Sequence, residues 1–353
     1  MKKILALVLV LALALTLAAC GGNGASSSTP AAGGSSAAGS STPASEPAGE
    51  MDVVNVAYMA NYASLVEVCT AMEKGYFADE NIEVKLTAFQ DGPTIIAAME
   101  SGSIDIGYIG SGAHKLAING QCKIFCFAHV GNGDAVMGLK SKGVETAADL
   151  KGKTIGYAPG TSSETILKQV LADAGLSESD VNLMSMDADG IVTAMIGDSL
   201  DAAALWSPST LKVEEELGGD VVTLADNLTY ADQAASISSW IVMPSYAEAN
   251  HDLLVRFTRA LYKAKDYRAD MSNADEISGY IATLTGLDKD TVYAQRGDAE
   301  WLTSEEMLAQ IEDGTLAAMY QTQQNGFIAT GDVAAEVPLE DYILWDVMEE
   351  AGA

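Results

Sequence analysis

Arginine is scarce in this chain of 353 residues, which contains only four, all beyond residue 250. A guanidinium group holds carboxylate, sulfonate and phosphate oxygens through a planar fork of N–H donors. The first 250 residues lack that fork. We therefore expect a site formed by them to hold any anion through backbone N–H groups and hydroxyls.

Positive charge of either kind is sparse, with 19 Lys and Arg against 49 Asp and Glu and a formal net charge of −30. A surface this acidic repels nucleic acid and anionic lipid head groups, so nucleic acid is excluded as a partner. The acidic clusters at residues 214–216 and 349–350 are typical of solvated faces.

Cysteine and histidine are too few and too scattered to indicate a metal or a cofactor site. Beyond Cys20 the chain has Cys69, Cys122 and Cys126, and an odd number in an exported protein argues against a disulfide framework. Buried free thiols are the simplest interpretation, although a bridge from Cys69 to either of the others stays open. No CxxC motif or His/Cys cluster has metal-ligand spacing.

Long apolar runs are also missing beyond residue 20, so we expect no transmembrane helix there. The apolar run at residues 4–17 follows Lys2 and Lys3 and is too short to span a bilayer, which is typical of a signal peptide. It ends in Leu-Ala-Ala-Cys and resembles a bacterial lipobox, in which Cys20 receives a diacylglycerol before cleavage. The alternative is an ordinary signal peptide with a chance cysteine.

A tether follows the signal peptide. Residues 21–50 consist almost wholly of Gly, Ala, Ser, Thr and Pro, which cannot bury enough apolar surface to offset the entropy of ordering. About 30 flexible residues reach roughly 30 Å. This length suits a folded body held at the outer face of a membrane.

The remaining chain is large enough for two lobes, and its pattern indicates an α/β fold. Strands are expected at residues 53–59, 82–86 and 104–109, with helices at 64–75 and 94–99 between them. Ser64 and Glu67 would form a capping box for the first helix. The same βαβαβ pattern recurs about 100 residues later, at residues 154–158, 162–174, 181–186, 191–196 and 200–205. We interpret this as a structural half-repeat.

The last third is mostly helical after a strand at residues 238–243, with helices expected at 246–271, 274–285, 288–295 and 304–325. These helices must pack on a sheet that already exists. The chain would cross between lobes near residues 131–138 and 236–243, and two crossing segments form a hinge. The predicted organisation is a signal peptide (1–20), a tether (21–50), a first lobe (51–137 and 241–353) and a second lobe (138–240).

Several short motifs in this order resemble the solute-binding lipoproteins of ABC importers, in the group that binds nitrate, taurine, aliphatic sulfonates and thiamine-pyrimidine precursors. They are EKGYF at 73–77, IEV at 82–84, GP at 92–93, AAM at 97–99 and GSIDIG at 102–107, then DLKGKTIG at 149–156, PGTSS at 159–163, DA at 201–202 and WSP at 206–208. The resemblance implies a two-lobed periplasmic-binding-protein type II fold. In that fold two mostly parallel sheets are joined by a two-segment hinge.

Ligands of open α/β sheets bind beyond the carboxyl ends of the strands, which places four loops around a cleft. A helix that starts after Gly160 would offer free N–H groups and hydroxyls to an anion, although Thr161 and Glu164 also match a plain capping box. Asp91 or Asp187 would accept hydrogen bonds from a neutral or zwitterionic heterocycle. The candidate ligand-binding residues are Asn61, Tyr62, Asp91, Gly92, Pro93, Ser111, Gly112, Gly160, Thr161, Ser162, Ser163, Asp187 and Trp206.

The resemblance implies capture of a small solute and its delivery to an ABC permease with its ATPase subunit, by a monomer anchored through lipidated Cys20 to the outer face of the cell membrane. Sulfonate, taurine or nitrate is the first expectation for the solute, and a thiamine-pyrimidine precursor or similar neutral heterocycle is the alternative. A tethered sensor and a pyrimidine-synthase-like enzyme are the alternatives from other classes. The sequence offers no paired carboxylates, no nucleophile with a base and no histidine in the expected loops, so we predict no catalysis.

Overall fold

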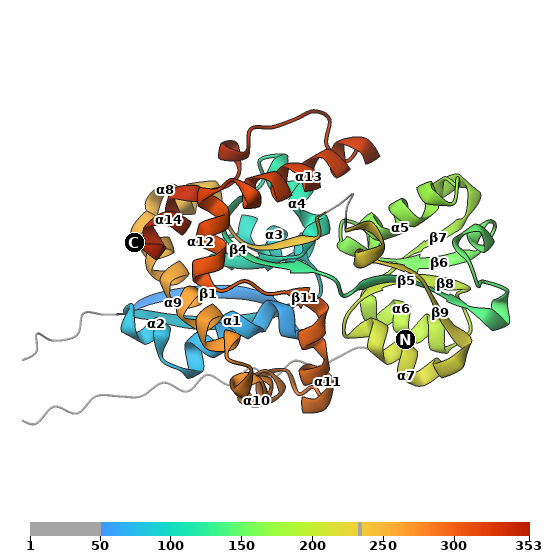
Figure 1. Cartoon of the computed structure of the whole chain (residues 1–353), viewed down its shortest axis with the longest axis horizontal. Coiled ribbons are helices and arrows are strands. Elements are labelled where there is room, and N and C mark those ends of the chain that lie inside the picture. Colours follow the sequence, from blue (N-terminus) through green and yellow to red (C-terminus); the bar gives the residue numbers. More distant parts are fainter. Residues whose placement is uncertain (1–50, 232–234) are drawn as a thin grey trace, which may run out of the picture. The chain divides into compact units, whose positions relative to one another are not determined.

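A computed structural model describes residues 51–231 and 235–353 of the chain. Cys20, the signal peptide and the tether lie outside the described residues. The described part contains a six-stranded and a five-stranded sheet, each covered by helices (Figure 1). We call the parts built on these sheets the first lobe and the second lobe. The α/β fold class is confirmed.

The first lobe is built around a sheet with the order β11-β4-β10-β3-β1-β2. Its strands are β1 (Asp52–Met59), β2 (Ile82–Phe89), β3 (Ile106–Ile109), β4 (Lys123–Gly131), β10 (Ile237–Val242) and β11 (Ala299–Glu300). Strand β1 pairs in parallel with β2 and β3, whereas β10 runs antiparallel to β3 and β4. The parallel pairs follow from the βαβ connections, which return each strand in the same direction.

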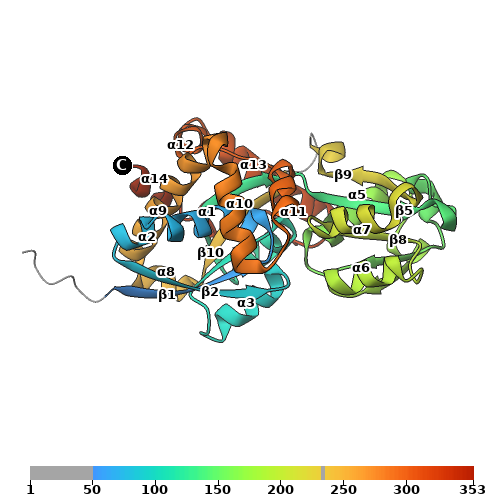
Figure 2. The ribbon, with the colours of Figure 1, turned by 90° about the horizontal axis from the view of Figure 1, so that it is seen from below.

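The helices of the first lobe come from both ends of the described chain. They are α1 (Tyr62–Glu73), α2 (Tyr76–Asp79), α3 (Gly92–Glu100), α4 (His114–Ile118), α8 (Pro244–Ala249), α9 (His251–Ala269), α10 (Ala274–Thr285), α11 (Lys289–Ala294), α12 (Ser304–Glu312), α13 (Thr315–Thr330) and α14 (Trp345–Gly352). Helix α9 packs against α1 and α14, so the last third of the chain completes the core begun by the first. Figure 2 shows the orange helices α10 and α11 beside the blue α1.

The second lobe has a sheet with the order β7-β6-β8-β5-β9. Its elements are β5 (Asp134–Leu139), β6 (Thr154–Tyr157), α5 (Ser162–Asp173), β7 (Asn182–Ser185), α6 (Ala188–Ile196), β8 (Ala202–Trp206), α7 (Ser209–Leu217) and β9 (Val221–Asp226). Strand β6 pairs in parallel with β7 and β8, and β5 runs antiparallel to β8 and β9. Separate apolar clusters, one containing Leu167 and one containing Met195, form its core.

The two sheets repeat one topology. Strands β6, β7, β8 and β9 occupy the positions that β1, β2, β3 and β4 hold in the first sheet, and β5 takes the position of β10. Each sheet is mixed: most of its strands run in one direction, whereas β10 and β11 in the first sheet and β5 in the second run in the opposite direction. The half-repeat predicted from the sequence is present in the order of the strands.

The lobe boundaries differ from the predicted ones by a few residues. The chain leaves the first sheet after Gly131 and enters the second at Asp134, not after residue 137. It returns to the first sheet at Ile237, before the expected residue 241. Both crossing strands are short and entirely buried, so their hydrophobic pattern alone does not show which sheet they join.

Three local predictions are wrong for identifiable reasons. Helix α1 begins after Asn61, whose side chain accepts from Ser64 N, while Ser64 Oγ accepts from Met59 N, so Ser64 does not cap it. The expected helix 304–325 is broken at Gly314, which has a φ of 81°. The expected helix 246–271 is broken at Asn250. None of the helices in the described ranges is long and apolar enough to cross a membrane.

Candidate functional site

A cavity lies between the two lobes, at the carboxyl ends of the strands. It measures about 640 Å³ including the space open to solvent. Asn61 after β1, Ser111 after β3, Thr161 after β6 and Trp206 at the end of β8 all line it. Both halves of the repeated fold thus contribute the same kind of loop, as expected for ligand sites of open α/β sheets.

The structure brings seven of the thirteen predicted residues to the wall of this cavity. Their role in ligand binding stays a prediction. They are Asn61, Asp91, Gly92, Ser111, Thr161, Ser162 and Trp206.

Three of the remaining six predicted residues are committed to structure within their own lobes. Tyr62 is buried and packs edge-on against Trp301, with ring centroids 5.6 Å apart. Ser163 Oγ donates to the carbonyl of Ala204 at 2.8 Å. Asp187 caps α6 through its side chain, as Asp91 caps α3 in the first lobe. The matched pair of aspartates therefore reflects helix capping in both halves of the repeat.

The other three, Pro93, Gly112 and Gly160, lie where the lobes touch. A Cβ atom at Gly112 would lie 2.0 Å from the backbone carbon of Thr161, because the two backbones meet there. A Cβ at Gly160 would lie 2.9 Å from Pro93 Cγ. The structure is therefore a closed form, and closure requires glycine at position 112.

Sequence reasoning missed several residues that line the cavity, above all Asp134, Asp298 and His129. The signal for Asp134 was its position at the first crossing between lobes, which is where a hinge faces the cleft. Asp298 comes from the helical last third, which carries no βαβ pattern. The other missed residues include Tyr108, Gly133, Ser207, Ser236, Ser238 and Gln295.

Asp134 is the most buried carboxylate of the cavity. Its Oδ1 accepts from Ser162 Oγ at 2.5 Å and its Oδ2 accepts from Asn227 Nδ2 at 2.9 Å. Ser236 Oγ also donates to Oδ2, at 3.4 Å. Burial raises the pKa of Asp134, and these three donors oppose the rise.

Asp298, at the end of a short 3₁₀ helix (Gln295–Asp298), is the second carboxylate at this end of the cavity. Burial and the nearby charge of Asp134 raise the pKa of Asp298 to about 6, while the Ser207 hydroxyl beside it partly offsets the rise. Neither Asp134 nor Asp298 forms an ion pair with a lysine, arginine or histidine of the described residues.

His129 forms part of the cavity wall from β4. Its Nε2 lies 2.6 Å from the Tyr108 hydroxyl, and its ring lies 4.8 Å from that of Trp301. Burial, with Lys265 and Arg268 nearby, lowers the pKa of His129 to about 3, so the imidazole is neutral. A neutral ring can orient a ligand but adds no positive charge to the cavity.

The N-terminus of α5 does not present the expected free hydroxyls. Ser162 Oγ is bound to Asp134, and Ser163 Oγ is bound to Ala204. Thr161 Oγ1 donates to the Ala158 carbonyl, and Gly160 N donates to Glu164 Oε2. Thr161 and Glu164 therefore form no capping box, and the three hydroxyls predicted to receive an anion already serve other partners.

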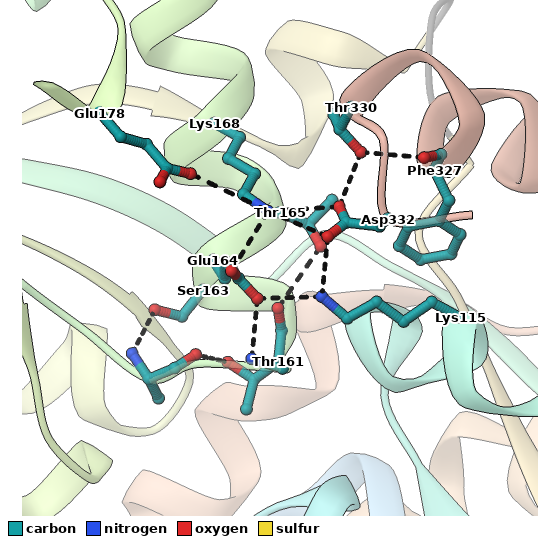
Figure 3. A network of polar contacts seen from close by, with 12 residues as sticks. Lys115, Thr161, Ser163, Glu164, Thr165, Lys168, Glu178, Phe327, Thr330 and Asp332 are labelled. Atoms are coloured by element: carbon teal, nitrogen blue, oxygen red, sulfur yellow. Dashed lines mark hydrogen bonds and ion pairs between the residues drawn. The ribbon is translucent and has the colours of Figure 1, made fainter. Parts of the chain in front are cut away.

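A network of ion pairs joins the lobes beside the cavity (Figure 3). Lys115 on α4 lies 2.9 Å from Glu164 on α5 and 3.4 Å from Asp332, which follows α13. Lys168, on the next turn of α5, lies 3.0 Å from Asp332 and 3.2 Å from Glu164. We call these four residues the interlobe network. Their side chains are largely buried, so solvent screens their charges less than at an open surface.

The remaining chemistry-bearing residues indicate neither a metal site nor a reactive thiol. Within residues 51–231 and 235–353, no three His, Cys, Asp or Glu side chains gather as metal ligands. Cys69, Cys122 and Cys126 are buried and free, and burial raises the pKa of each to about 12. A thiol with so high a pKa is a poor nucleophile.

A family model described as NMT1/THI5 like matches residues 63–273, more than half of the chain. The chain belongs to this family.

The curated relatives of this NMT1/THI5-like chain are named as binding proteins. A putative binding protein of Brucella abortus is 30% identical over 83% of the chain and 90% of its own length. A putative aliphatic sulfonates-binding protein of Bacillus subtilis is 26% identical over 83% of the chain and 81% of its own length. The taurine-binding periplasmic protein of Escherichia coli is 24% identical over 77% of the chain and 85% of its own length.

Solved structures share the fold. The alkanesulfonate-binding protein SsuA of Xanthomonas axonopodis, bound to MOPS, has a TM-score of 0.64 at 20% identity and covers 85% of the chain and 99% of its own. A desulfurization enzyme, DSZB, has a TM-score of 0.60 at 15% identity and covers 85% of the chain and 98% of its own. The fold alone therefore does not separate binding proteins from enzymes. The names of these curated relatives support a binding-protein role for the chain and not an enzymatic one.

Proposed function

We propose that this protein is the lipid-anchored solute-binding component of an ABC importer. It captures a small organic solute in the cavity between its lobes, and the closed form delivers that solute to a permease driven by an ATPase subunit. The observation that carries the proposal is the cavity itself, which both lobes line and which their backbone contact at Gly112 and Thr161 closes.

The same cavity explains how binding would be coupled to closure. Asn61 and Asp91 come from the first lobe, and Trp206 comes from the second, so a solute that touches all three favours the form in which the lobes meet. A ligand shifts such an equilibrium only by its difference in affinity for the two forms. The names of the relatives favour an organic sulfonate or taurine, and a heterocycle is the alternative.

The experiment compares a glycine at the contact between the lobes with a glycine away from the cavity. Thermal shift with taurine, methanesulfonate, nitrate and an aminopyrimidine identifies a bound compound, and small-angle scattering then measures closure upon its addition. Gly112→Ala places a methyl group against the backbone of Thr161, so we expect at least tenfold weaker binding and little change in the radius of gyration.

Gly219→Ala is the control, because Gly219 lies in the second lobe away from the cavity and a Cβ there meets nothing within 4 Å. It should behave like the natural protein. Unchanged closure in Gly112→Ala would contradict the proposed closing contact. If none of the compounds raised the melting temperature or changed the scattering of the natural protein, the solute-binding role itself would be refuted.

A further inference from the structure

We propose that the cavity receives a positively charged nitrogen group of the solute, an ammonium, amidinium or protonated heterocyclic nitrogen, against the carboxylates of Asp134 and Asp298. The inference rests on the proposed function and specifies the charge of its solute. It differs from the sulfonate that the names of the relatives favour.

The first observation is the charge of the cavity wall. Asp91, Asp134 and Asp298 line it, whereas no lysine or arginine of residues 51–231 and 235–353 does, and His129 is neutral. Removing a carboxylate from water is unfavourable unless a cation or enough hydrogen-bond donors replace the water. Asp134 has three such donors within the protein, whereas the Ser207 hydroxyl beside Asp298 forms no hydrogen bond with any of the described residues. A cation on the ligand would supply the missing partner for the Asp298 carboxylate.

The second observation concerns the start of α5, where an anion would be expected to bind. Asp134 already accepts from Ser162 there, and Glu164 already accepts from Gly160 N. The partial positive charge of the helix N-terminus is therefore balanced by carboxylates of the chain itself. An incoming sulfonate would meet Asp134 at close range and would be repelled.

The third observation is a pair of buried polar atoms on the cavity wall that lack hydrogen-bond partners. Ser207 Oγ and His129 Nδ1 have none among the described residues, although the two side chains are only 7% and 3% exposed. Unpaired buried groups cost free energy, so they are found where a ligand or water completes them. Ser207 lies beside Asp298, which places an unused hydroxyl next to the carboxylate that needs a cation.

The position of Trp206 also favours a positively charged ligand. It ends β8, lines the cavity and is only partly buried, so part of its indole ring remains available to a ligand. Cations are attracted to the face of an indole ring, and the attraction strengthens when water is excluded. An amidinium or a protonated aromatic heterocycle is a group that can form both a cation–π contact with Trp206 and an ion pair with Asp298.

The test uses probes of similar size and different charge on the purified full chain. The pairs are benzamidine with benzenesulfonate and methylguanidine with methanesulfonate, and isothermal titration measures their affinities at pH 7. We expect the cation of each pair to bind at least tenfold more tightly than its anion. Asp298→Asn, which removes the charge at nearly constant shape, should weaken benzamidine binding at least tenfold.

The pH dependence adds a second readout. Since the pKa of Asp298 is about 6, the carboxylate is mostly ionised at pH 7 and mostly protonated at pH 5, so benzamidine should bind about tenfold more weakly at pH 5. The other titratable groups of the cavity wall are Asp91, Asp134, Tyr108 and His129, and the neutral His129 gains no proton over this range. Asp298→Asn should lose most of this pH dependence.

Asp187→Asn is the control, because Asp187 is an aspartate at a helix start that does not line the cavity. It should bind benzamidine like the natural protein. The inference is overturned if benzamidine does not bind, if either sulfonate binds as tightly as its cationic partner, or if Asp298→Asn leaves the affinity for benzamidine unchanged. Tight sulfonate binding accompanied by closure of the lobes would contradict the inferred positive charge of the solute, but it would still support the solute-binding role.

Discussion

A buried ion pair joins Glu67 on α1 to Lys265 on α9 in the core of the first lobe. Lys265 Nζ lies 2.5 Å from Glu67 Oε1 and donates to the Ala128 carbonyl, while Trp240 Nε1 donates to Glu67 Oε2. Both charged side chains are almost completely buried. Lys265→Met would leave an unpaired buried carboxylate, so we expect the free energy of unfolding to fall by about 3–5 kcal/mol in urea titrations.

Two further variants isolate this effect. Glu67→Gln combined with Lys265→Met keeps an acceptor for Trp240 and removes both charges, so it should recover at least half of the loss. Lys263 lies on the same helix, but its side chain is partly exposed. Lys263→Met should therefore lower the free energy of unfolding by less than about 1 kcal/mol. A double variant no more stable than Lys265→Met alone would show that the charge of Glu67 is not the cause.

Single residues also show what the sequence could and could not reveal about the site. Asn61, Ser111 and Thr161 were predictable because each follows a strand whose carboxyl end faces the cleft. For Asp134 the only sign in the sequence was its position at the first crossing between lobes, and for Asp298 there was none. The first starts a crossing strand and the second ends a 3₁₀ helix between helices, and neither setting has a spacing that marks a ligand site.

At the scale of elements, α4 and α5 belong to different lobes, and the interlobe network joins them in this closed form. Lys168→Met removes the pair with Asp332 across the lobes and leaves the core of the second lobe intact. We expect the population of the open form to rise and the affinity for a bound solute to fall about 5–20-fold, because a partly buried ion pair contributes more stabilising free energy than an exposed one. The loss should shrink at high salt, which already screens the pair in the natural protein.

Lys151→Met provides the matched comparison, because Lys151 pairs with Asp180 within the second lobe and its side chain is 70% exposed. Titration calorimetry at low and high salt should find its affinity unchanged. If Lys168→Met bound the solute as tightly as the natural protein at low salt, the network would have no part in closure.

The elements themselves were largely predictable, since the paired βαβαβ patterns appear where strand, helix and glycine signals recur about 100 residues apart. The assignment of β5 and β10 to sheets was not. Both strands are fully buried, so their residue pattern does not indicate which of the two sheets they join. Only the pairing with neighbouring strands in the folded structure shows that β5 belongs to the second sheet and β10 to the first.

At the scale of the whole molecule, the proposed anchor at Cys20 can be tested apart from solute binding. Cells that express the full chain should incorporate radioactive palmitate into it, and Cys20→Ser should abolish the label and release the protein from the membrane. Cys69→Ser is the control, because Cys69 is buried in the first lobe and should not affect labelling. Persistent label in Cys20→Ser would point to another attachment site.

The exchange of strands between the halves also has a consequence for how the chain folds. The second sheet uses one continuous stretch, from Asp134 to Asp226, whereas the first sheet receives β10 only after that stretch is complete. During synthesis from the N-terminus, all strands of the second lobe are therefore available before the first lobe is complete. In the first sheet, the position of β10 between β3 and β4 stays empty until residue 242 has been synthesised. The first sheet is therefore completed only after every strand of the second sheet has been synthesised.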